Sequence, residues 1–118
     1  MKKRVLVVED DSAVLEAVRL MLKDEFEVIV ATNGIEAVRI YEAYKPDLVL
    51  MDIMLPTMDG VEATKEIIKR DKNAKIVAVT AYATKRGKEI LDAGAKEVVE
   101  KPFTRKKLLE TVRKYAGS

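Results

Sequence analysis

With 118 residues, the chain is long enough for one domain with a sizeable core and too short for two. Apolar residues make up 48% and charged residues 36% of the sequence, and the net charge of +2 does not demand an anionic partner. The sequence has no cysteine and no histidine, which excludes disulfides, thiolate or imidazole zinc sites, and Ser-His or Cys-His nucleophile pairs.

Strand and helix patterns alternate five times along the chain. Short apolar runs predict strands at residues 4–8, 27–31, 48–52, 75–79 and 97–99. The run Leu48 to Met51 is wholly apolar, which is typical of a parallel strand that is buried on both faces. It ends in a carboxylate, Asp52, which is either a polar strand terminus or a nucleophile.

Apolar residues at helical spacing follow each expected strand. The expected helices cover about residues 12–23, 34–45, 61–70, 84–93 and 104–115. The second helix should bury one face, formed by Ala37, Val38, Tyr41 and Tyr44. Five strand–helix units without hairpin signals favour an α/β fold, in which helices cover both faces of a parallel sheet. We expect residues 1–118 to form one domain with no effector domain.

Polar residues follow four of the five expected strands. They are Glu9, Asp10 and Asp11 after the first strand, Asp52 at the third, Thr80 (followed by Ala81) at the fourth, and Lys101 (followed by Pro102) after the fifth. The carboxyl ends of parallel strands share one edge, where open α/β sheets bind ligands. Crowded carboxylates need a cation, and a site of oxygen ligands alone suits Mg²⁺. Asp52 could then attack phosphorus, while Thr80 and Lys101 hold the phosphoryl oxygens.

Each of these groups also has an ordinary structural explanation. Asp10, Asp11 and Ser12 could cap a helix, and Thr80 could be a β-branched strand residue. Lys101 could be a solvated surface charge, and residues 56–60 contain the proline, aspartate and glycine of a plain turn. The coincidence of all these groups at one edge favours the phosphoryl-transfer interpretation.

Five segments together resemble the receiver domain of two-component response regulators. They are residues 7–11, 47–52, 54–60, 79–81 and 100–103, which occur in the family's order, and the resemblance extends over essentially the whole chain. The resemblance implies a flavodoxin-like doubly wound parallel sheet with strand order 2-1-3-4-5. It also implies that Asp52 is the phosphoacceptor, that Asp10 binds Mg²⁺ directly and Glu9 through water, and that the backbone carbonyl of Met54 is a further ligand.

The same resemblance implies roles for the last two strand ends. Thr80, followed by Ala81, matches the switch hydroxyl, and Lys101 matches the phosphate-binding lysine. The bond between Lys101 and Pro102 is expected to be cis, which only proline makes accessible at low cost.

The sequence departs from the family at Val98, where an aromatic residue or histidine usually stands three positions before the lysine. Valine has no ring to rotate, so we expect movement of residues 82–87 to replace this part of the switch. Met54 and Tyr82 match the two positions that flank the acyl phosphate. Both are bulky and cannot position water as a carboxylate or amide could, so we expect slow autodephosphorylation.

The resemblance implies a phosphorylation switch and not a turnover enzyme. The phosphoryl donor would be a phosphohistidine of a sensor histidine kinase or a histidine phosphotransfer protein, and the role that of a chemotaxis-type diffusible regulator or a phosphorelay intermediate. The alternative is an aspartyl-nucleophile phosphohydrolase, but haloacid dehalogenase-type enzymes need Asp-x-Asp and Asp52-Ile53-Met54 lacks the second acid. A nucleotide- or flavin-binding module fits poorly, because its phosphates would meet an acidic first turn.

Basic residues are frequent in the last third of the chain. They are Lys85, Arg86, Lys88, Arg105, Lys106, Lys107, Arg113 and Lys114. They could form a solvated helix surface, or the face of the last two helices and the strand between them where the family's targets and dimer partners bind. We expect a downstream protein target, a monomer or weak phosphorylation-dependent dimer, and no direct nucleic-acid binding. No apolar run could span a membrane and no signal peptide is evident, so we expect a cytoplasmic protein without membrane insertion.

Overall fold

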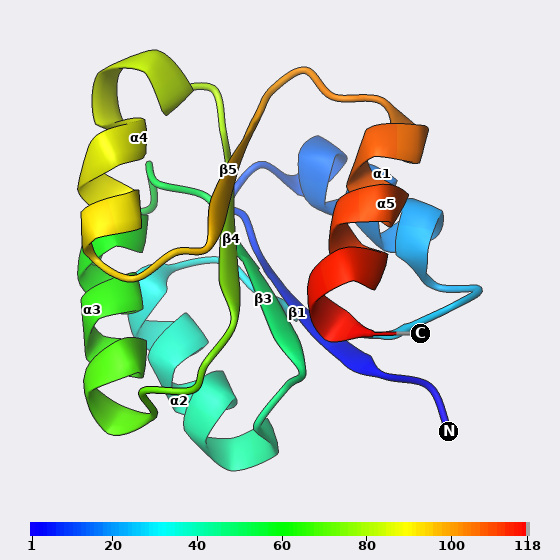
Figure 1. Ribbon diagram of the computed structural model, residues 1–118, viewed down its shortest axis with the longest axis horizontal. Coiled ribbons are helices and arrows are strands. Elements are labelled where there is room, and N and C mark those ends of the chain that lie inside the picture. The colour runs from blue at the N-terminus through cyan, green and yellow to red at the C-terminus, as the bar shows by residue number, and fades with distance from the viewer. Residues whose placement is uncertain (118) are drawn as a thin grey trace.

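Five parallel strands form one sheet in the order β2-β1-β3-β4-β5 in the computed structural model, which describes residues 1–117 (Figure 1). The strands are β1 (Arg4–Val8), β2 (Glu27–Ala31), β3 (Leu48–Met51), β4 (Ile76–Thr80) and β5 (Glu97–Glu100). The helices are α1 (Ser12–Leu22), α2 (Gly34–Tyr44), α3 (Gly60–Arg70), α4 (Ala83–Asp92) and α5 (Arg105–Ala116). Of the helices in this described part, none is long and apolar enough to cross a membrane. The predicted flavodoxin-like fold and strand order are confirmed.

Helices cover both faces of the sheet, with α1 and α5 on one side and α2, α3 and α4 on the other (Figure 1). In β1, Val5 and Val7 belong to the core beneath α1 and α5, whereas Leu6 and Val8 belong to the core on the opposite face. Because successive strand residues point to opposite faces, a strand covered on both sides is apolar throughout. All of Leu48–Met51 is accordingly buried.

Local side-chain bonds account for most of the helix starts. The N-terminal caps of α1, α2, α3 and α5 are Asp11, Asn33, Asp59 and Thr104, and each accepts a hydrogen bond from a backbone N–H in the first turn. The start of α4 at Tyr82 has no such side-chain bond. The helix boundaries accordingly fall within about a residue of those that the sequence predicts.

The expected burial of Tyr44 is wrong. Its side chain is 53% exposed, whereas Tyr41, one turn earlier, is 4% exposed. Tyr44 is the last residue of α2, and the following Lys45 turns the chain in a left-handed conformation. Instead of entering the core, the Tyr44 ring lies 5.8 Å from the Arg4 guanidinium, at a distance that permits a cation–π contact.

The strand register positions the polar strand ends. The Asp52 N–H donates to the Val8 carbonyl at 3.1 Å, which places Asp52 beside Glu9, the residue that follows β1. At the β4–β5 end of the strand order, the Lys101 N–H donates to the Thr80 carbonyl at 2.9 Å. The ladder thus continues past the strands and brings acidic, hydroxyl and ammonium groups to one edge.

Candidate functional site

Three carboxylates converge at the carboxyl edge of the sheet. Glu9, Asp10 and Asp52 each offer an oxygen, and these atoms all lie within 4.8 Å of one another. Glu9 and Asp52 are buried, at 4% and 7% exposure, while Asp10 is open to solvent. Such crowded carboxylates require a neighbouring cation. Because the donors are hard oxygens without nitrogen or sulfur, the residues present fit Mg²⁺.

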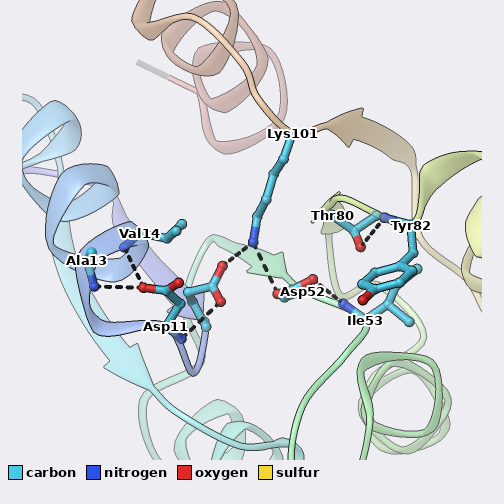
Figure 2. A network of polar contacts seen from close by, with 9 residues as sticks. Asp11, Ala13, Val14, Asp52, Ile53, Thr80, Tyr82 and Lys101 are labelled. Atoms are coloured by element: carbon cyan, nitrogen blue, oxygen red, sulfur yellow. Dashed lines mark hydrogen bonds and ion pairs between the residues drawn. The ribbon is translucent and has the colours of Figure 1, made fainter.

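The Lys101 ammonium lies between the two buried carboxylates. It donates to Glu9 Oε1 and, at 3.2 Å, to Asp52 Oδ2. Figure 2 shows Lys101 extending from the end of β5 toward Asp52. The pKa of Glu9 is raised by burial and by the charge of Asp52, against the opposing hydrogen bond from Lys101. Burial alone would lower the pKa of Lys101, but the bond to Glu9 and the charge of Asp52 raise it, so the lysine stays protonated.

Both carboxylate oxygens of Asp52 are held. Oδ1 accepts a hydrogen bond from the Ile53 N–H at 2.8 Å, and Oδ2 accepts from Lys101 (Figure 2). The backbone is held as well, because the Gly60 N–H donates to the Ile53 carbonyl at 2.7 Å. A Cβ on Gly60 would lie 1.9 Å from the Asp52 carbonyl oxygen, so only glycine fits there. The sequence had indicated no more than a turn at this position.

Thr80 ends β4 with its side chain fully buried. Its Oγ1 accepts a hydrogen bond from the Tyr82 N–H at 3.1 Å (Figure 2). Accepting this bond leaves the hydroxyl proton free to donate to an oxygen bound near Asp52. Ala81, between the two residues, is exposed.

The remaining predicted site residues lie around this centre. The Met54 and Tyr82 side chains are 45% and 42% exposed. Val98 is partly buried against the core on the α4 side, and its methyl groups lie 3.8 and 3.9 Å from the point where a Cβ on Gly87 would sit. The bond between Lys101 and Pro102 is cis, as expected. A ligand role for the Met54 carbonyl stays a prediction.

Asp11 has the structural role that the sequence left open. Its Oδ1 accepts from the Ala13 N–H at 2.9 Å and the Val14 N–H at 3.3 Å, which caps α1 (Figure 2). The Asp11 backbone N–H in turn donates to Glu9 Oε2 at 3.2 Å. Asp11 therefore turns toward the helix, whereas Asp10 contributes to the carboxylate cluster.

Sequence reasoning missed two contacts beside the site, both made by Arg86 of α4. Its Nη2 lies 3.2 Å from Asp59 Oδ2, and its Nη1 lies 3.6 Å from Met54 Sδ. The partners are 27 and 32 positions away in the chain, so no local pattern indicates them. The sequence marked Arg86 only as one of several surface charges.

A model of the response regulator receiver domain matches residues 5–113, which is most of the chain. The chain belongs to this family. Two curated relatives of this receiver domain are named chemotaxis protein CheY. The one from Thermotoga maritima is 46% identical over 121 residues, covering 97% of this chain and 98% of the relative. The one from Halobacterium salinarum is 40% identical over 114 residues, covering 95% of each.

The solved structures include a similar receiver domain. It is part of a sensor histidine kinase from Pseudomonas aeruginosa and superimposes with a TM-score of 0.93 at 33% identity, covering 100% of both chains. That structure holds a magnesium ion coordinated in its active-site cleft. The predicted family is confirmed, and the chain is a CheY-like receiver domain of two-component signalling. The phosphohydrolase alternative is not favoured.

Proposed function

We propose that this receiver domain accepts a phosphoryl group onto Asp52 in a Mg²⁺-dependent reaction and acts as a phosphorylation switch. The donor is a phosphohistidine of a sensor histidine kinase or a histidine phosphotransfer protein. The observation that carries the proposal is the geometry at Asp52, a buried carboxylate with its two oxygens held by the Ile53 N–H and the Lys101 ammonium. Glu9 and Asp10 beside it complete an oxygen site for the metal.

The residues of the site have complementary tasks in the transfer. A carboxylate oxygen of Asp52 attacks the phosphorus, the phosphorus–nitrogen bond breaks, and the imidazole leaves with its electron pair and takes up a proton. Lys101 shifts its hydrogen bond from the carboxylate to a phosphoryl oxygen, and Thr80 donates its hydroxyl proton to another. Mg²⁺ held by Asp10, Asp52, Glu9 and the Met54 carbonyl would neutralise the negative charge of the reacting groups.

The product is a long-lived switch state and the chain is not a turnover enzyme. In this proposal, the bulky Met54 and Tyr82 side chains flank the acyl phosphate and offer no group that positions water for attack. Replacing them together, Met54→Asn with Tyr82→Glu, is expected to accelerate loss of the phosphoryl group. An unchanged rate of decay would contradict the shielding role.

Output would pass through the face formed by α4, β5 and α5. Several of its basic side chains already have acidic neighbours, since Lys107 and Lys114 both lie 3.5 Å from Glu97. Among residues 1–117, Lys85, Arg105 and Lys106 have no acidic side chain within ion-pair distance and could bind a downstream protein. We propose a cytoplasmic monomer, or a weak phosphorylation-dependent dimer, that does not bind nucleic acid directly.

Incubation with Mg²⁺ and acetyl phosphate, followed by intact-mass measurement, tests the proposed chemistry. The wild-type chain should gain the mass of one phosphoryl group, and chelation of Mg²⁺ should prevent the gain. Asp52→Asn should gain none. Asp24→Asn changes an exposed aspartate just before β2, at the amino-terminal edge of the sheet opposite the site, and should be phosphorylated normally.

Two results would overturn the proposal. One is a phosphoryl group that still appears on Asp52→Asn, because the acceptor would then be another residue. The other is repeated release of phosphate without a trapped adduct, which would favour a hydrolase.

A further inference from the structure

Arg86 connects α4 to the loop between β3 and α3, which comprises residues 52–59. Its guanidinium donates to Asp59 Oδ2 at 3.2 Å and lies 3.6 Å from Met54 Sδ. Its Nε donates to Glu89 Oε2 at 2.6 Å, one turn along the same helix. The Arg86 side chain is only 28% exposed. Each of the three guanidinium nitrogens therefore has a partner, so the planar group occupies one defined position over the loop.

Little else ties α4 to that loop. Within residues 1–117, Arg86 makes the only side-chain hydrogen bonds from α4 to another element. The helix starts without a side-chain cap and buries only Gly87 and Ile90. A glycine in a helix interior also weakens the helix. Arg86 therefore supplies the side-chain hydrogen bonds that join α4 to the loop.

The loop is held from its other end by Asp59. Asp59 Oδ1 accepts from the Glu62 N–H at 3.0 Å and caps α3, while Oδ2 binds Arg86. Between Asp52 and Asp59, the Met54 thioether accepts the third contact of the guanidinium. One arginine thus restrains both the far end of the loop and the flexible side chain that stands two residues after Asp52.

We propose that Arg86 is a positioning residue that holds the Met54 side chain beside Asp52 and thereby sets the lifetime of the phosphorylated state. The inference deepens the proposed function and rests on it. Methionine has three rotatable side-chain bonds, so a free Met54 would sample many orientations and expose the acyl phosphate to water. Bound to Arg86, it stays in one orientation and excludes water from that side.

The test follows decay of the phosphorylated protein by intact mass after the acetyl phosphate is removed, with Mg²⁺ present. Arg86→Met keeps much of the apolar stem but removes all donors, and it should accelerate decay about three- to tenfold, as expected for the loss of contacts of ordinary strength. Asp59→Asn keeps an oxygen that caps α3 but removes the charge, and it should have a smaller effect in the same direction.

A double-mutant cycle distinguishes positioning of Met54 from a general effect of Arg86. Met54→Leu keeps a similar volume and removes the sulfur acceptor, so it should accelerate decay by itself. Adding Arg86→Met to Met54→Leu should then have less effect than Arg86→Met has alone, because the two residues act through one contact. Lys88→Met is the matched control, since Lys88 pairs only with Asp92 on the same helix, and its decay should equal that of the wild type.

Thermal melts of the unphosphorylated variants separate stability from positioning. Lower stability of Arg86→Met with an unchanged decay rate would overturn the inference, since Arg86 would then only support the fold. Equal effects of Arg86→Met with and without Met54→Leu would also overturn it. Failure of the wild type to take up any phosphoryl group would instead overturn the proposed function, and this inference with it.

Discussion

Thr64 lies in α3 with its side chain fully buried, and its Oγ1 is the only buried side-chain polar atom of residues 1–117 without a hydrogen-bond partner. A buried hydroxyl without a partner costs about 1–3 kcal/mol of stability. Thr64→Val replaces the hydroxyl by a methyl group of similar shape, and the two residues have similar helix propensities. We therefore expect a gain of about 1 kcal/mol or more in the free energy of unfolding, which raises Tm by about 3–6 °C.

Thr111 provides a matched control for this substitution. It is also helical and buried, but its hydroxyl donates to the Lys107 carbonyl at 2.8 Å. Thr111→Val loses that bond and should gain less than Thr64→Val, or lose stability. Urea unfolding of both variants gives the comparison, provided that the m-value does not change. If Thr64→Val is no more stable than Thr111→Val, the Thr64 hydroxyl has a partner such as a buried water, and the reasoning fails.

Three further predictions concern the site and its surroundings. Lys101→Met leaves two buried carboxylates without their cation, so urea melts should show a loss of roughly 3 kcal/mol that added Mg²⁺ reduces. Gly60→Ala forces the end of β3 to move and should lower the free energy of unfolding by about 2 kcal/mol or more. By contrast, a Cβ at Gly87 meets only ordinary contacts, so Gly87→Ala should stabilise α4 by about 0.5–1 kcal/mol in the same melts. The Tyr41 hydroxyl donates to Asp71 at 2.7 Å, and this hydrogen bond lowers the pKa of the Asp71 carboxyl. Tyr41→Phe removes the hydroxyl. Its cost of about 1–2 kcal/mol should be full above the usual aspartate pKa of about 4 and shrink toward that of a neutral hydrogen bond as the pH falls through the lowered value, which unfolding measured across pH would show.

Much of the fold could be predicted because its causes are local in sequence. The wholly apolar run Leu48–Met51 indicates a strand buried on both faces. Asp11 and Asp59 cap helices through bonds to backbone groups two or three positions away, so their signal lies in neighbouring residues. The alternation of strands and helices leads to a parallel sheet, and a parallel sheet brings its polar strand ends to one edge.

Tertiary structure alone decided how those groups meet. The register of β1, β3 and β5 places the Lys101 ammonium between Glu9 and Asp52, and packing of Gly60 against the Asp52 carbonyl excludes any side chain there. Arg86 reaches its loop partners across more than two dozen positions of the chain. Short-range patterns reflect bonds that a residue makes with its neighbours, whereas these contacts depend on where separate elements come to lie against one another.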